Sequence, residues 1–229
     1  MKEKVLIFDS STIITLALNN LLDMFIALRK SNGKFLVTQA VKREIIDRPL
    51  KIKKFELGAL MIAQLLRDKV LEMPSMIGIT ETEFSEETKK FLEIANHTFK
   101  VKEEYLHIID EGEASCFALS KICKSNGIKN ILAIDERTAR MLCEKPFNLK
   151  KLLEKKLHTK VVMEEKNLSF FKSFDIIRSA ELCYVAYKKN LAGIKNGKKQ
   201  IIDALLYATK SKGCAISQQE IEIAKKLHI

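Results

Sequence analysis

The sequence predicts an α/β protein in which helices cover both faces of a central, twisted and mostly parallel sheet. Four short runs are continuously apolar, which suits strands that are buried on both faces. Segments with the apolar spacing of helices lie between these runs. Strands that alternate with helices form parallel sheets through right-handed crossovers. The expected architecture is a three-layer sandwich with a sheet of four or five strands, followed by a helical extension.

The predicted elements follow in chain order. Strands are expected at residues 5–8, 35–38, 131–134 and 161–163. Helices are expected at residues 13–29, 38–47, 55–70 and 91–95 and from about residue 112, and residues 170–229 are predicted to be entirely helical. This organisation predicts a domain at 1–165 with a helical insertion at 51–107, and a basic helical extension at 166–229.

The net charge of the chain is +11, and it is unevenly distributed. Residues 145–212 hold 16 lysines and arginines against 6 acidic residues, whereas residues 81–113 hold 10 acidic against 4 basic residues. A basic extension favours a polyanionic partner, because each phosphate contact releases condensed counterions. The alternative is a lysine-rich surface that contacts only solvent. Composition does not separate the two.

The N-terminal segment predicts no signal peptide, because Asp9 interrupts the apolar run and no small-residue cleavage site follows. The apolar stretches are shorter than the roughly 20 residues that a membrane-spanning helix needs. Five cysteines without a C-x-x-C pair and four scattered histidines favour reduced core thiols over a zinc site. We therefore expect a cytoplasmic protein whose chemistry depends on carboxylates.

Asp9 and Asp135 each directly follow a predicted strand. Open α/β sheets bind ligands at the carboxyl ends of their strands, so both residues are candidates for a functional site. A simpler explanation exists for Asp9, which could serve only to cap the helix that follows.

Two further acidic candidates lie in predicted helices. Glu44 falls beside the expected buried face of its helix, although an exposed glutamate is the commoner situation. Glu113 lies in a first helical turn and forms a capping-box pattern with Asp110. Capping accounts for Asp110, whereas Glu113 also points toward the end of the sheet where Asp9 emerges.

If Asp9, Glu44, Glu113 and Asp135 converge, their mutual repulsion raises their pKa values and destabilises the fold unless cations neutralise them. Mg²⁺ or Mn²⁺ suits this role, because both ions prefer oxygen ligands and share their coordination shell with phosphate oxygens. Such a site activates a water for in-line attack on a phosphodiester bond. The pattern therefore predicts an acidic metal site for phosphodiester hydrolysis.

Four blocks of the sequence contain the candidate acids, namely VLIFDSSTIITL, VTQAVKREII, DEGEASCFALS and ILAIDERTAR. In this order and spacing they resemble the PIN-domain family, a group of metal-dependent ribonucleases that includes the toxins of toxin–antitoxin pairs. The resemblance covers residues 5 to about 163, and a fainter likeness to the C-terminal helices of some toxin nucleases continues in AYKKNLAGIKNGKKQIIDALLYATKSKGCAIS. It implies a PIN-like three-layer fold.

The resemblance also assigns roles to the acidic residues. It makes Asp9, Glu44, Glu113 and Asp135 the catalytic set, and Asp9, Glu113 and Asp135 the metal ligands. Ser11 becomes a polar neighbour that orients the first carboxylate. Glu136 is a reserve candidate, because the last block often carries two adjacent acids in related sequences. The second acid here is a glutamate, which departs mildly from that pattern.

The family implies an endoribonuclease that uses Mg²⁺ or Mn²⁺ and acts on single-stranded or structured RNA, often as a homodimer and often as the toxin partner of a small antitoxin protein. One alternative is a non-catalytic RNA-binding or assembly module on the same fold, which the basic extension would suit. Another is a phosphatase of the haloacid dehalogenase type, because FDSST is similar to its first motif. That motif needs a second acid where Ser11 stands, which weakens the phosphatase hypothesis.

Overall fold

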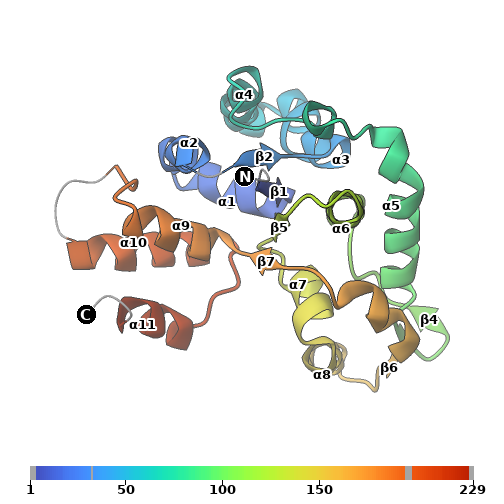
Figure 1. Ribbon diagram of the computed structural model, residues 1–229. Coiled ribbons are helices and arrows are strands. Elements are labelled where there is room, and N and C mark those ends of the chain that lie inside the picture. The colour runs from blue at the N-terminus through green and yellow to red at the C-terminus, as the bar shows by residue number, and fades with distance from the viewer. Residues whose placement is uncertain (1–3, 32, 194–197, 227–229) are drawn as a thin grey trace.

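A computed structural model, which describes residues 4–31, 33–193 and 198–226, shows an α/β protein rich in helix around a small parallel sheet (Figure 1). The sheet has four strands in the order β2-β1-β5-β7. These strands are β1 (Val5–Phe8), β2 (Lys34–Leu36), β5 (Asn130–Ala133) and β7 (Ile176–Ile177). All neighbouring pairs are parallel, so the carboxyl ends of the strands meet at one edge. The predicted fold class is confirmed at this level.

Three predicted strands correspond to β1, β2 and β5. The fourth predicted run also contains a strand, but its expected place in the parallel sheet was wrong. Residues 161–163 contribute β6 (Val162–Met163), which pairs antiparallel with β3 (Phe99–Val101) in a separate sheet. The strand β4 (Glu104–Tyr105) completes this second sheet, in the order β4-β3-β6. The fourth parallel strand is β7, in a segment predicted to be entirely helical. Half of β6 is exposed, since Val162 is 43% accessible, so this run does not suit a strand covered on both faces.

Helices lie on both sides of the parallel sheet (Figure 1). On one side are α1 (Ser10–Leu18), α2 (Leu22–Ser31) and α9 (Ser179–Lys188), and on the other are α3 (Gln39–Lys42), α5 (Glu81–Asn96) and α6 (Glu111–Ser125). The remaining helices are α4 (Lys53–Arg67), α7 (Arg137–Glu144), α8 (Pro146–Leu157), α10 (Lys198–Ser211) and α11 (Gln218–Lys226). Short 3₁₀ turns lie at Pro49–Lys51, Pro74–Ile77 and Glu165–Phe171.

Two helical predictions were wrong in detail. The helix expected at 13–29 is two helices, α1 and α2, because the chain turns at Asn20, which has a left-handed φ of 56°. The helix expected at 38–47 begins as α3 and continues as a π-helical segment, Arg43–Asp47, in which Arg48 N donates to Arg43 O. The insertion at 51–107 contains α4 and α5 but also the strands β3 and β4, so it is not only helical.

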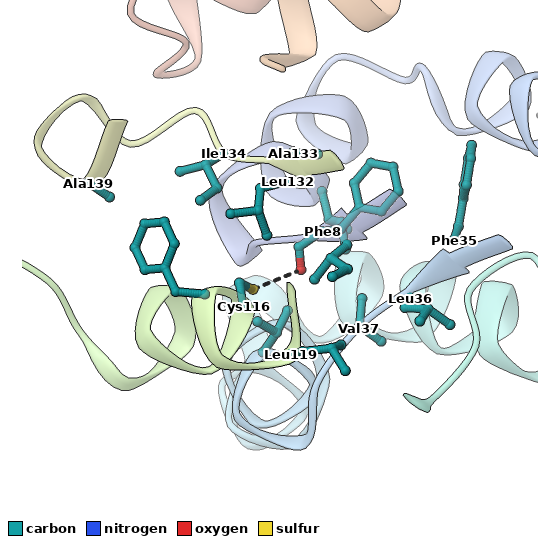
Figure 2. Packing of buried hydrophobic residues seen from close by; sticks show 14 of the residues in the cluster. Phe8, Phe35, Leu36, Val37, Cys116, Leu119, Leu132, Ala133, Ile134 and Ala139 are labelled. Atoms are coloured by element: carbon teal, nitrogen blue, oxygen red, sulfur yellow. Dashed lines mark hydrogen bonds between the residues drawn. The ribbon is translucent and has the colours of Figure 1, made fainter. Parts of the chain in front are cut away.

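The core joins the sheet to its flanking helices. Phe8, Phe25 and Phe35 pack with ring centroids 4.9 to 5.0 Å apart, which ties β1 and β2 to α2. On the other side of the sheet, the thiol of Cys116 in α6 lies 3.6 Å from the carbonyl oxygen of Phe8, as Figure 2 shows. Leu119 lies beside it in the same cluster. This packing holds the first turns of α6 close to the carboxyl end of β1.

The C-terminal helices have a small apolar cluster of their own. It includes Ala180 of α9, Leu206 of α10 and Ile221 of α11. Within the described residues, none of the helices has the length and apolar character that crossing a membrane requires.

Candidate active site

Asp9 lies directly after β1 and caps α1. Its side chain is 1% exposed, and one oxygen, Oδ2, accepts hydrogen bonds from the backbone N–H and the hydroxyl of Ser11. The other oxygen, Oδ1, is buried and accepts no hydrogen bond from the described residues. Burial raises the pKa of Asp9 to about 6 despite the bonds from Ser11, and the charge of Glu44 adds to this effect. Helix capping alone does not explain Asp9, because a cap needs only Oδ2, whereas Oδ1 is removed from water without gaining a hydrogen bond.

Glu113 lies in the first turn of α6, where the capping box with Asp110 forms as predicted. One oxygen of Glu113 accepts the backbone N–H of Asp110 at 3.0 Å. Burial raises the pKa of Glu113 to about 8, and the negative charge of Asp9 is the second cause. Glu113 can therefore cap α6 and also interact with Asp9, because capping uses only one of its two carboxylate oxygens.

Glu44 approaches the same helix from the π-helical segment. A Cβ atom at position 112 would lie 2.8 Å from Glu44 Oε2 and 2.9 Å from Oε1, so only glycine leaves room for this carboxylate. Burial raises the pKa of Glu44, a hydrogen bond with the Ser10 side chain opposes this rise, and the charge of Asp110 adds to it. Glu44 is thus held beside the first turn of α6.

Asp9, Glu44 and Glu113 form one electrostatic group, which lies around Cys116. Burial is the main cause of the strongly raised pKa of the Cys116 thiol, and the charges of these three residues raise it further. The structure therefore brings together three of the four carboxylates that the sequence singled out.

Asp135 follows β5 and is 1% exposed, but its side chain belongs to a different network. Oδ1 accepts the backbone N–H of Ser179 at 2.7 Å, and Oδ2 accepts the Ser179 hydroxyl at 2.6 Å. Its charge raises the pKa values of Cys183 and Cys214, for which burial is the first cause. Asp135 thus faces the first turn of α9 with both oxygens occupied.

Ser11 connects the two networks. Its hydroxyl donates to Asp9 Oδ2 and accepts the backbone N–H of Asp135 at 3.1 Å. The ends of β1 and β5 are therefore joined through one side chain. Glu136, the reserve candidate, caps α7 by accepting the backbone N–H groups of Arg137 and Thr138, so its side chain has a structural role.

Among the described residues, no three His, Cys, Asp or Glu side chains are arranged so that they could hold a metal ion together. The acidic group nevertheless offers oxygen atoms as ligands, and one of them, Asp9 Oδ1, has no hydrogen-bond partner in the described part of the chain. Mg²⁺ is commonly bound through one or two carboxylates and keeps several waters. The pair Asp9 and Glu113 fits an ion of that kind better than a metal enclosed by protein ligands.

Sequence reasoning missed two residues that organise the site. Ser179 follows a strand of only two residues, which is too short to show a pattern. Gly112 was quoted within a motif, but its role in admitting Glu44 depends on a contact between segments 68 residues apart in the chain.

Comparisons with protein-family models, with curated proteins and with solved structures find no match for this chain. The function must therefore be argued from the site.

Proposed function

We propose that this protein is an endoribonuclease that hydrolyses RNA phosphodiester bonds with the help of Mg²⁺ or Mn²⁺. The proposal rests on one observation, the pair formed by the buried Asp9 and the partly buried Glu113 at the carboxyl edge of a parallel sheet. Both carboxylates have raised pKa values, and Asp9 Oδ1 has no hydrogen-bond donor among the described residues. Groups that are costly to ionise without a counter-ion are typical of cation sites and catalytic sites.

A PIN-like fold is part of the proposal. The order β2-β1-β5-β7, with acids directly after β1 and β5 and at the start of α6, is compatible with the blocks that resemble that family. The homodimer and the antitoxin partner enter the proposal only through this resemblance.

Asp9 and Glu113 would hold the cation, because the charge of Asp9 raises the pKa of Glu113 and Asp9 Oδ1 has no hydrogen-bond partner among the described residues. The bound ion would supply Lewis acidity and a water of lowered pKa for attack on phosphorus. Ser11 fixes the orientation of Asp9 by donating hydrogen bonds to Oδ2, which leaves Oδ1 available for the cation. Glu113 carries a proton at neutral pH in the metal-free protein, because its pKa is about 8, and must lose it to act as a ligand. Glu44 adds negative charge beside the pair.

A second candidate, a non-catalytic RNA-binding or assembly module, is favoured by a specific observation. Both oxygens of Asp135 already accept hydrogen bonds from Ser179, so this acid is engaged in holding α9 to the sheet. A site that lacks Asp135 as a ligand has fewer groups with which to fix a metal.

Cleavage of a mixed RNA pool, with Mg²⁺ or Mn²⁺ added after treatment with a chelator, separates these functions. We expect metal-dependent cleavage that falls at least about 100-fold in Asp9→Asn and in Glu113→Gln, since metal catalysis supplies several kcal/mol. Glu111→Gln is the matched control, because it removes an exposed carboxylate from the same helical turn.

Three results would contradict the nuclease proposal. RNA binding that needs no metal and leads to no cleavage would support the module. Turnover of a small phosphate ester with a trapped aspartyl-phosphate at Asp9 would support the phosphatase. Cleavage that persists in both Asp9→Asn and Glu113→Gln would show that another site is responsible.

A further inference from the structure

A cleft of about 740 Å³ lies between α7, α8 and the C-terminal segments that contain α9 and α11. It lies outside the acidic group described above, and none of Asp9, Glu44 or Glu113 lines it. Five of its lining residues are basic, namely Arg137, Arg140, Lys145, Lys151 and Arg178.

The acidic residues of the cleft are already paired. Arg178 forms ion pairs with Glu181 and with Glu220, the latter at 2.9 Å. Arg140 Nε lies 3.6 Å from a carboxylate oxygen of Glu144. The three glutamates that line the cleft are thus engaged with two of the five basic side chains.

Three positive charges remain for a ligand. Within the described residues, the side chains of Arg137, Lys145 and Lys151 form no ion pair, and all three are exposed. Arg140 has donor capacity left as well, because its Nη1 is buried and has no acceptor in the described chain, while Nη2 donates to Ala215 O at 3.2 Å. The free charges therefore favour an anionic occupant.

The cleft begins at the carboxyl ends of β5 and β7. Arg137 is two residues after Asp135, and Arg178 directly precedes Ser179, whose hydroxyl and N–H bind Asp135. A chain of phosphates in the cleft would therefore leave it beside the carboxyl edge of the sheet.

The spread of the charges favours a strand over a single anion. Lys145 and Lys151 are six residues apart at the start and within α8, which corresponds to about 9 Å along a helix axis. Arg137 lies on another helix, α7. A single phosphate would contact all three less readily than a backbone that carries several.

We propose that this cleft binds the phosphate backbone of single-stranded RNA next to the position of cleavage. The proposal rests on the nuclease function proposed above and names the path of its substrate. Arg137, Lys145 and Lys151 contact phosphates, and the paired Arg178 holds α11 in place as one wall of the cleft.

The test compares two double variants that each remove two positive charges. Arg137→Ala with Lys151→Ala removes two of the three unpaired positive charges from the cleft, whereas Lys155→Ala with Lys156→Ala removes exposed lysines from α8 that do not line it. Binding of a short, fluorescein-labelled single-stranded RNA of mixed sequence is measured by anisotropy over a range of salt concentrations. A chelator is present, so that no cleavage interferes. All four side chains are exposed, and thermal melting checks that both variants fold.

Counterion release gives the expected size of the effect. Each lost phosphate contact lowers the salt slope by about 0.7, so the cleft variant should lose about 1.4 in slope and about 25-fold in affinity at about 0.1 M salt. The control pair should change affinity by less than about 3-fold, since unspecific attraction is spread over the whole surface.

Equal weakening in both double variants would overturn the inference, because general surface charge would then explain binding. Unchanged binding in the cleft variant, or no RNA binding by the wild type, would overturn it as well. The outcome is separable from the nuclease proposal. If the cleft variant binds RNA more weakly but the wild type cleaves no RNA, the cleft proposal is supported and the nuclease proposal is refuted. If the wild type cleaves RNA but the cleft variant binds it as well as the wild type does, the nuclease proposal is supported and the cleft proposal is refuted.

Discussion

Replacing Asp9 with asparagine should stabilise the metal-free protein, although it should weaken the proposed cleavage. The folded state raises the pKa of Asp9, mainly through burial, so it binds the proton more tightly than the unfolded chain does. Stability linked to this residue is therefore fully present below about pH 4 and is lost as the pH rises through about 6. Asparagine carries no charge at any of these pH values and keeps an oxygen that can accept the N–H of Ser11.

The magnitude follows from the two pKa values, 3.8 for the unfolded chain and about 6 for the folded protein. A difference of about 2, at about 1.4 kcal/mol for each tenfold change in proton affinity, corresponds to about 3 kcal/mol at about pH 8. About half of this penalty is present at about pH 5, where the unfolded carboxylate is ionised and the folded one is protonated. For a chain of this size, 3 kcal/mol corresponds to a rise in Tm of about 6 to 12 °C.

Urea unfolding followed by circular dichroism, at about pH 5 and about pH 8 in the presence of a chelator, measures this gain. Asp175→Asn is the matched control, because Asp175 is exposed, and its replacement should change the free energy of unfolding by no more than about 0.5 kcal/mol. Equal stability of Asp9→Asn and the wild type at about pH 8 would refute the reasoning. A gain that is the same at both pH values would refute it too, since repulsion and burial act only on the charged form.

Three further outcomes are expected. Cleavage at a fixed Mg²⁺ concentration should rise with pH between about 6 and 8, because both paired carboxylates must lose their protons before they bind a cation. Ser179→Ala should lower the free energy of unfolding by about 1.5 to 3 kcal/mol, since it removes a donor from the buried carboxylate of Asp135, whereas Ser125→Ala at an exposed position should cost less than about 0.5 kcal/mol. Gly112→Ala should displace Glu44 and reduce cleavage while the circular dichroism spectrum stays unchanged, because the added methyl group meets a flexible side chain and no backbone.

The sequence could predict the part of the fold that depends on local pattern. The strands β1, β2 and β5 are runs of three or four largely buried residues, and the capping box at Asp110 follows from the type and spacing of two side chains. The placement of Asp9 at a strand end and of Glu113 in a first helical turn needed only these local rules. Their proximity follows from the packing of α6 against the carboxyl end of β1, where the Cys116 thiol contacts the carbonyl oxygen of Phe8.

Other features depend on contacts that local pattern does not encode. The break at Asn20 needs a left-handed residue within a continuous apolar pattern. The π-helical segment is only one turn long, so the sequence pattern there does not differ from that of an ordinary helix. The strand β7 has only two residues, and its pairing is visible only through its partner β5. The run at 161–163 is apolar like a parallel strand, but the segment it pairs with lies in the insertion. In each case contacts with distant parts of the chain decide which of the conformations or strand pairings compatible with the local sequence is formed.

The dependence of the sheet on β7 also bears on where the predicted N-terminal domain ends. A boundary at 165 was predicted from the run of basic helical sequence, yet Asp175 O and Ile177 O accept the backbone N–H groups of Leu132 and Ile134. Ser179 then satisfies both oxygens of Asp135, which are buried and would otherwise lack donors. Buried groups without partners cost more than the bonds themselves contribute. The segment around β7 is therefore structurally part of the sheet, and the network that joins Asp135 to Ser11 and Asp9 needs it in place.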